Sequence, residues 1–132
     1  RAIVRRPGTD ITIVGYSRMA QVAEQAAEML ARKGTEAEVI DLRTLRPLDM
    51  ETITESVKKT NRVVYLEEGW PYAGTGAQIV AMIQEEAFDY LDAPILRVTQ
   101  ADVPMPYAKS LEILAKPSAD RVVEACRNVL YR

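Results

Sequence analysis

The chain has 132 residues, which at roughly 100–200 residues per domain allows a single domain. Hydrophobic residues make up 48% of it and charged residues 27%, values typical of a globular protein that buries a core. Seventeen basic and nineteen acidic residues leave a formal net charge of −2. This balance argues against nucleic-acid binding, because contacts to phosphates require a clustered basic excess.

The chain contains no histidine and one cysteine, Cys126. A Ser–His–Asp or Cys–His relay therefore cannot be built within it, and a zinc site is not expected. The lone cysteine allows no internal disulfide, is compatible with a reducing compartment, and is interpreted as a small core residue. No apolar run approaches the ~20 residues of a membrane-spanning helix, and no signal sequence opens the chain, so we expect no membrane association.

Runs of β-branched residues predict strands, and apolar side chains spaced by three and four residues predict the helices between them. In chain order, strands are expected around residues 2–4 and at 11–14, 37–42, 62–66 and 94–99. The helices between them are one capped by Ser17 and stopped by Gly34, one from its cap at Asp49 to about Lys59, and one from Gly74 to about Tyr90. The third of these helices carries Ile79, Met82, Ile83, Ala87 and Tyr90 on one side, and a last helix, opened by residues 117–118, has Val122, Cys126, Val129 and Leu130 inward.

Strands that alternate with helices of 10–18 residues imply parallel neighbours, because a parallel crossover needs a dozen or more residues. The first strand is separated from the second by residues 5–10, which are too few for a crossover helix. We therefore expect it to run antiparallel at an edge. The predicted fold is one domain over residues 1–132, a three-layer α/β/α sandwich around a five-stranded, mostly parallel sheet.

Two glycine-containing turns resemble catalytic or binding motifs. Residues 15–19 resemble a nucleophile elbow, but Met19 stands where a small residue is needed and the relay histidine is missing, which favours an ordinary capped turn. Residues 74–76 follow a strand and open a helix as a dinucleotide loop would. Because Ile79 replaces the third small residue, a glycine turn that lets the helix start close to the sheet is favoured over phosphate binding.

Glu67 and Glu68 stand at the carboxyl end of a predicted strand, beside the aromatic segment 69–72. Ligands of open α/β sheets bind at this end, so the two carboxylates are candidates for acid–base work. The alternative, which we favour, is that one glutamate bonds backbone amides while the aromatic loop packs on a partner.

The segment 102–108 carries two prolines at alternate positions, which makes it stiff and extended. A stiff loop with apolar side chains is typical of an interface.

Four segments, residues 36–49, 57–62, 67–71 and 102–108, resemble the carboxyl-terminal domain of the beta subunits of thiamin-diphosphate-dependent 2-oxoacid dehydrogenases. The resemblance covers essentially the whole chain. The last two segments are similar to the pyruvate enzyme, while branched-chain 2-oxoacid and acetoin dehydrogenases are alternatives. Gln100 departs from the glycine expected there.

The resemblance implies the fold of a transketolase carboxyl-terminal domain, within a fragment of a longer beta subunit. It implies that the whole enzyme oxidatively decarboxylates pyruvate and passes the acetyl group to lipoamide. Thiamin diphosphate and magnesium would be bound outside this domain, which would contribute no catalytic, cofactor-binding or metal-ligating residue. The location would be the bacterial cytoplasm, which we prefer, or the mitochondrial matrix.

The resemblance also implies partners: an alpha subunit, a second beta subunit within an α2β2 heterotetramer, and the basic peripheral subunit-binding domain of dihydrolipoyl acetyltransferase. The interface candidates are Trp70, Pro71, Pro104, Met105, Pro106 and Tyr107. The docking candidates are Glu85, Glu86, Asp89, Asp92 and Arg132. Charge complementarity would steer a basic module to the carboxylates among them. A solvated helix end explains these carboxylates equally well. A free-standing small-ligand-binding α/β domain and an unrelated interaction module are the other hypotheses.

Overall fold

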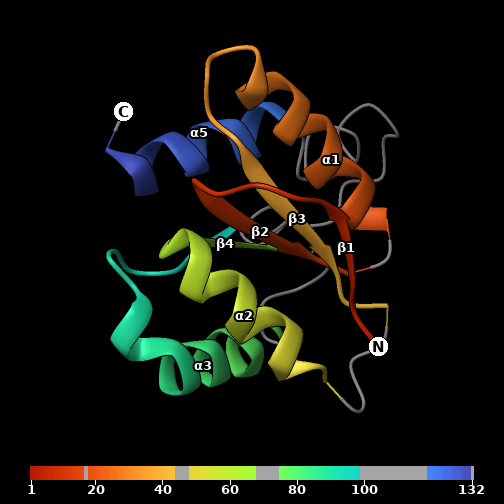
Figure 1. Ribbon diagram of the computed structural model, residues 1–132. Coiled ribbons are helices and arrows are strands. Elements are labelled where there is room, and N and C mark those ends of the chain that lie inside the picture. Colours follow the sequence, from red (N-terminus) through yellow and green to blue (C-terminus); the bar gives the residue numbers. More distant parts are fainter. Residues whose placement is uncertain (17, 44–47, 68–74, 99–118, 132) are drawn as a thin grey trace, which may run out of the picture.

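The computed structural model of the protein describes residues 1–16, 18–43, 48–67, 75–98 and 119–131 (Figure 1). Within these residues, five strands alternate with four α-helices and one short 3-10 helix. The elements are β1 (Ile3–Arg6), β2 (Ile11–Gly15), α1 (Arg18–Ala31), β3 (Ala37–Asp41), α2 (Met50–Thr60), β4 (Val63–Leu66), α3 (Thr75–Ala87), the 3-10 helix η2 (Phe88–Tyr90), β5 (Leu96–Val98) and α5 (Ala119–Leu130).

The strands form one sheet in the order β1-β3-β2-β4-β5. β2 is parallel to β3 and to β4, and β4 is parallel to β5. β1 is antiparallel to β3, with Val4 opposite Ile40, and it lies at the edge of the sheet. The predicted antiparallel edge strand is therefore confirmed.

Helices cover both faces of the sheet, α1 and α5 on one side and α2 and α3 on the other (Figure 1). Neighbouring residues of a strand point to opposite faces, so Ile13 and Val64 pack with α1 and α5, whereas Val14 and Tyr65 pack with α2 and α3. β2, β3 and β4 are buried along their whole length, as parallel strands covered on both faces must be. The three-layer α/β/α sandwich is confirmed.

The predicted ends of two helices are also confirmed. Asp49 caps α2 by accepting a hydrogen bond from the backbone N–H of Thr52, and Leu48 packs against the core that contains Ile53. After α1, Gly34 has φ = 87°, a left-handed conformation that glycine adopts without strain.

The helix expected to run to Tyr90 is shorter than predicted. α3 ends at Ala87 and η2 follows, and the side chains of Met82 and Tyr90 are 40% and 39% exposed. These two side chains, expected on one side of the helix together with Ile79, Ile83 and Ala87, are therefore not buried with them. α3 buries Ile79, Ile83 and Ala87, which are four residues apart and form a narrow stripe. Met82 lies beside this stripe, and Tyr90 follows the point where the α-helical repeat ends.

No helix in the described part of the chain is long and apolar enough to span a bilayer. The predicted cap Ser17, the end of the fifth strand at Thr99 and the start of the last helix at residues 117–118 lie outside the described residues.

Candidate functional site

An ion pair lies at the carboxyl end of the two strands β4 and β5. Glu67 follows β4 directly, and its Oε1 accepts a hydrogen bond from Nη2 of Arg97 in β5 at 2.6 Å. The two side chains are only 14% and 27% exposed, so their mutual attraction is less screened than that of a surface pair. The backbone N–H of Glu67 also donates to the carbonyl of Val98 at 3.0 Å.

The carboxylate of Glu67 also lies against the first turn of α3. A Cβ atom placed on Gly76 would overlap with the two oxygens and Cδ of Glu67, so a residue with a side chain would displace the carboxylate. The glycine turn predicted at residues 74–76 thus allows close approach of a side chain to the helix, while Gly74 lies outside the described residues. A carboxylate already placed near this helix start disfavours a phosphate there, because the two anions would repel each other.

The surroundings of Glu67 favour a structural charge over acid–base chemistry. The charge of Glu67 is compensated by Arg97. Burial raises the pKa of Tyr65, two residues earlier in the chain, well above the usual range, and the charge of Glu67 raises it further. Nε of Arg97 is buried and has no hydrogen-bond partner within the described part of the chain. Among the described residues, no group of three or more His, Cys, Asp or Glu side chains is placed to hold a metal ion.

Arg97 is the partner that reasoning from the sequence missed. The sequence does show an arginine inside a short apolar strand, the next strand after the one that Glu67 follows. It indicates an ion pair with Glu67 only once β4 and β5 are known to be neighbours. Glu68 and the interface candidates Trp70, Pro71, Pro104, Met105, Pro106 and Tyr107 lie outside the described residues, so their roles stay predictions.

A second charged cluster ties β1 to its neighbours. The buried carboxylate of Asp41 accepts hydrogen bonds from Nη1 of Arg5 and from the backbone N–H of Arg43, both at 3.0 Å. Nε of Arg5 also pairs with Glu24 in α1 at 2.8 Å. The hydrogen bond to Asp41 and the charge of Glu24 raise the pKa of Arg5 above its ordinary value. These contacts fasten the edge strand to the sheet and to α1.

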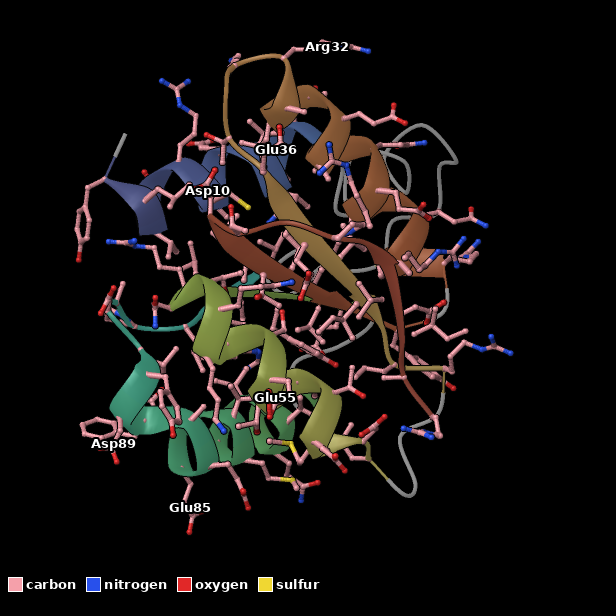
Figure 2. The ribbon with its side chains drawn as sticks, in the orientation of Figure 1. Asp10, Arg32, Glu36, Glu55, Glu85 and Asp89 are labelled. Atoms are coloured by element: carbon pink, nitrogen blue, oxygen red, sulfur yellow. The ribbon has the colours of Figure 1, made fainter. Side chains whose placement is uncertain are left out.

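The acidic docking candidates that the structure describes lie on the outer surface of α3 and of the residues after it. Glu85, Glu86, Asp89 and Asp92 are all exposed, and Figure 2 shows Glu85 and Asp89 pointing away from the sheet. The segment 75–96 contains no lysine or arginine. The exposed apolar side chains of Met82 and Phe88, the latter 64% exposed, accompany these carboxylates along the chain.

Asp92 is linked to the last helix through two intervening residues. The backbone N–H of Asp92 donates to the carbonyl of Asn61 at 2.8 Å. Arg62, which follows Asn61, donates from Nε to the carbonyl of Val129 in α5 at 3.2 Å. The structure therefore brings Asp92 and the last turn of α5 to the same end of the sheet. Arg132, the docking candidate that follows this turn, lies outside the described residues.

The topology defines the class of this protein, a three-layer α/β/α sandwich with one antiparallel edge strand. The Glu67–Arg97 ion pair lies at the carboxyl end of its parallel strands β4 and β5. The family model for the transketolase C-terminal domain matches residues 1–122. Because this match covers most of the chain, the protein belongs to the transketolase C-terminal domain family.

Proteins similar to the whole chain carry a consistent name. The chain is 54% identical over 132 residues to the "Pyruvate dehydrogenase E1 component subunit beta, mitochondrial" of Dictyostelium discoideum, covering 100% of this chain and 37% of that protein. It is 52% identical over 131 residues to the corresponding subunit beta of Rickettsia conorii, covering 99% of this chain and 40% of that protein. The resemblance inferred from the sequence is thus confirmed, and the chain spans about two fifths of these relatives.

Solved structures support the same fold. A "Split gene transketolase, inactive beta4 tetramer" matches with a TM-score of 0.83 at 32% identity, covering 99% of this chain and 41% of that one. A transketolase from Pichia stipitis matches with a TM-score of 0.61 at 17% identity, covering 99% of this chain and 18% of that one, and supports the fold alone. The predicted transketolase-like fold class is confirmed.

Proposed function

We propose that the chain is the carboxyl-terminal domain of the beta subunit of a thiamin-diphosphate-dependent pyruvate dehydrogenase. The observation that carries this proposal is identity above 50% along the whole chain to pyruvate dehydrogenase beta subunits. The whole enzyme would oxidatively decarboxylate pyruvate and transfer the acetyl group to lipoamide of dihydrolipoyl acetyltransferase. Its location would be the bacterial cytoplasm or the mitochondrial matrix, in line with the relatives from Rickettsia and from mitochondria.

Within that enzyme, the domain would serve assembly and would not take part in the chemistry. The sequence contains no histidine, and the described carboxylates do not gather into a group that suits magnesium and a diphosphate. These residues do not fit the cofactor, and no step of the reaction is assigned to them. Thiamin diphosphate and magnesium would be bound by other parts of the enzyme.

Reconstitution tests the proposed enzyme. The chain, joined to the remaining part of a beta subunit and co-expressed with an alpha subunit, is expected to form an α2β2 assembly with pyruvate-dependent reduction of an artificial electron acceptor. The same beta subunit without residues 1–132 is the control and should not assemble. Assembly without activity on pyruvate would contradict the proposal, and activity on branched-chain 2-oxoacids or acetoin instead would assign the chain to one of those enzymes.

The exposed acidic surface supports a second part of the proposal, docking of the peripheral subunit-binding domain of the acetyltransferase. Glu85, Glu86, Asp89 and Asp92 form a negative stretch without basic residues, and a small basic module would be attracted to it. Asp92 is bonded to Asn61, whose neighbour Arg62 is bonded to Val129 in α5, and this link would extend the docking surface toward the last residues of the chain.

Titration calorimetry with that isolated module tests the docking surface. Binding should weaken as salt rises, because exposed charges are screened, and should be lost when the four carboxylates are replaced by amides. The control replaces Glu28 by glutamine, because this exposed residue lies on α1, outside the proposed docking surface. Equal loss of binding in the control, or binding that ignores salt, would contradict this surface.

A further inference from the structure

A small cavity lies between the end of α1 and the last turns of α5. Its volume is about 140 Å³. The residues that line it are Leu30, Lys33, Thr35, Arg127 and Leu130. Thr35 comes two residues before β3, so the cavity lies toward the amino end of the parallel strands. It is therefore separate from the Glu67–Arg97 pair, which lies at their carboxyl end.

The cavity combines apolar walls with two cationic side chains. Leu30 and Leu130 belong to the core between α1 and α5 and are 1% and 7% exposed. Lys33 and Arg127 are exposed, and neither forms an ion pair within the described part of the chain. Two like charges that line one small space repel each other, and an anion between them would remove this repulsion.

Other donors already serve the helix ends that these two cations could have capped. Basic side chains near a helix C-terminus often bond its last carbonyl groups. At the end of α1, the carbonyls of Leu30 and Ala31 accept from backbone N–H groups of residues 33–35 at 2.9 to 3.0 Å. At the end of α5, the carbonyl of Val129 accepts from Nε of Arg62 at 3.2 Å. The two cationic side chains are therefore available to a ligand.

The charges around the cavity favour an anion that contacts both cations. The amide dipoles of α1 and α5 each place about half a negative charge at the helix C-terminus, which opposes an anion there. The two full positive charges of Lys33 and Arg127 exceed this sum. Of the acidic residues close in sequence, Glu36 pairs with Arg6 at 3.2 Å, and Glu124 is not among the residues that line the cavity. Loss of either cation should therefore release the anion.

We propose that this cavity binds a small monocarboxylate with a short aliphatic tail. The carboxylate would accept hydrogen bonds from Nζ of Lys33 and from the guanidinium of Arg127, and the tail would lie against Leu30 and Leu130. An apolar cavity of about 150 Å³ holds one molecule of benzene. Butyrate has as many non-hydrogen atoms as benzene and so matches the volume. This binding goes beyond the proposed function and does not depend on it.

Titration of the full chain with sodium butyrate at constant ionic strength tests the site. We expect saturable shifts of the backbone N–H signals of residues 33–35 and Arg127 in proton–nitrogen NMR spectra. Butyramide, a neutral ligand of the same shape, should bind about tenfold more weakly, because the charge-assisted hydrogen bonds are lost. Affinity should rise about fourfold per methylene from acetate to butyrate. It should not rise further with longer acids, because the cavity is then full.

Single variants locate the binding site on the chain. K33Q and R127Q should each weaken butyrate binding about tenfold. R32Q is the matched control, because it removes a positive charge one position away from Lys33, and Figure 2 shows Arg32 pointing outward from the end of α1. If R32Q weakened binding as much as K33Q, the effect would be one of general charge, and the site would be overturned.

Three results on the unmodified chain would also overturn the proposal, so the test does not depend on whether a variant folds. The first is the absence of saturable shifts with butyrate. The second is butyramide that binds as tightly as butyrate, because the cations would then contribute nothing. The third is inorganic phosphate that binds as tightly as butyrate, because the apolar walls would then contribute nothing.

Discussion

Thr12, the second residue of β2, places a hydroxyl group in the core beneath α2. Its Oγ1 lies 2.7 Å from Oγ of Ser56 and 2.6 Å from Oγ1 of Thr60, and all three residues are buried. Thr60 donates its own proton to the carbonyl of Arg62. Thr12 must therefore donate to Thr60 and accept from Ser56, so that each buried hydroxyl has a partner.

Replacing Thr12 by valine keeps the shape of the side chain but leaves the Ser56 proton without an acceptor. We expect the free energy of unfolding to fall by about 1–3 kcal/mol, the usual cost of an unsatisfied buried donor. The double variant T12V/S56A removes the donor as well and should lose less than T12V alone. Urea unfolding of both variants measures this, and a T12V chain as stable as the unmodified one would contradict the network.

Side-chain hydrogen bonds are made at both ends of α2. At its start, Asp49 accepts hydrogen bonds from the hydroxyl of Thr52 at 2.7 Å, from the backbone N–H of Thr52 at 3.1 Å and from the N–H of Ala2 at 3.1 Å. At its end, Asn61 has φ = 65°, and its side chain donates to the carbonyl of Tyr90 at 2.8 Å. The two ends of one helix are thus bonded to Ala2, which directly precedes β1, and to Tyr90 in η2.

The cap of α2 predicts a pH dependence of stability. The hydrogen bonds from Thr52 and then from Ala2 lower the pKa of Asp49 below its ordinary value of about 3.9. Because the folded pKa is the lower one, the stabilisation is complete above the unfolded pKa and is lost as the pH falls through the folded value.

We therefore expect D49A to lower the free energy of unfolding by about 1 kcal/mol at neutral pH, the typical contribution of a helix cap. The difference from the unmodified chain should shrink as the pH falls below about 4. Urea unfolding between neutral and acidic pH measures the difference, and E51Q in the first turn of the same helix is the control. A difference that stays constant down to the acid range would contradict the role of the ionised cap.

At the scale of the whole molecule, the sheet separates two apolar cores. One contains side chains of α1 and α5, and the other contains side chains of α2 and α3. Cys126 belongs to the first core and is fully buried. Burial raises the pKa of its thiol to about 12, so the folded chain holds the protonated and unreactive form at neutral pH.

The burial of Cys126 makes it a reporter of global unfolding. At pH 8 we expect a thiol reagent to label it at a rate that follows the fraction of unfolded chains across a urea series. Circular dichroism on the same samples provides the comparison. Rapid labelling without urea would show that the α1–α5 side opens independently of the rest of the chain.

Much of the fold could be predicted because its signals are local. The cap at Asp49, the left-handed turn at Gly34 and the inward face of α5 each depend on residues a few positions apart. The antiparallel edge strand followed from the short link after it. Periodicity placed Met82 on the same side of α3 as Ile79 and Ile83, but it does not show how wide a stripe the neighbouring elements bury, and Met82 is left 40% exposed.

The sequence by itself determined the class of fold, most element positions and the family, because repeating apolar patterns and contiguous motifs can be recognised without knowing which distant residues are in contact. The tertiary structure decided which charges meet. Glu67 and Arg97 are 30 positions apart, and Arg62 and Val129, which share a hydrogen bond, are 67 positions apart. Such pairings depend on the order of strands in the sheet and on the way helices return across it, and no local pattern records either.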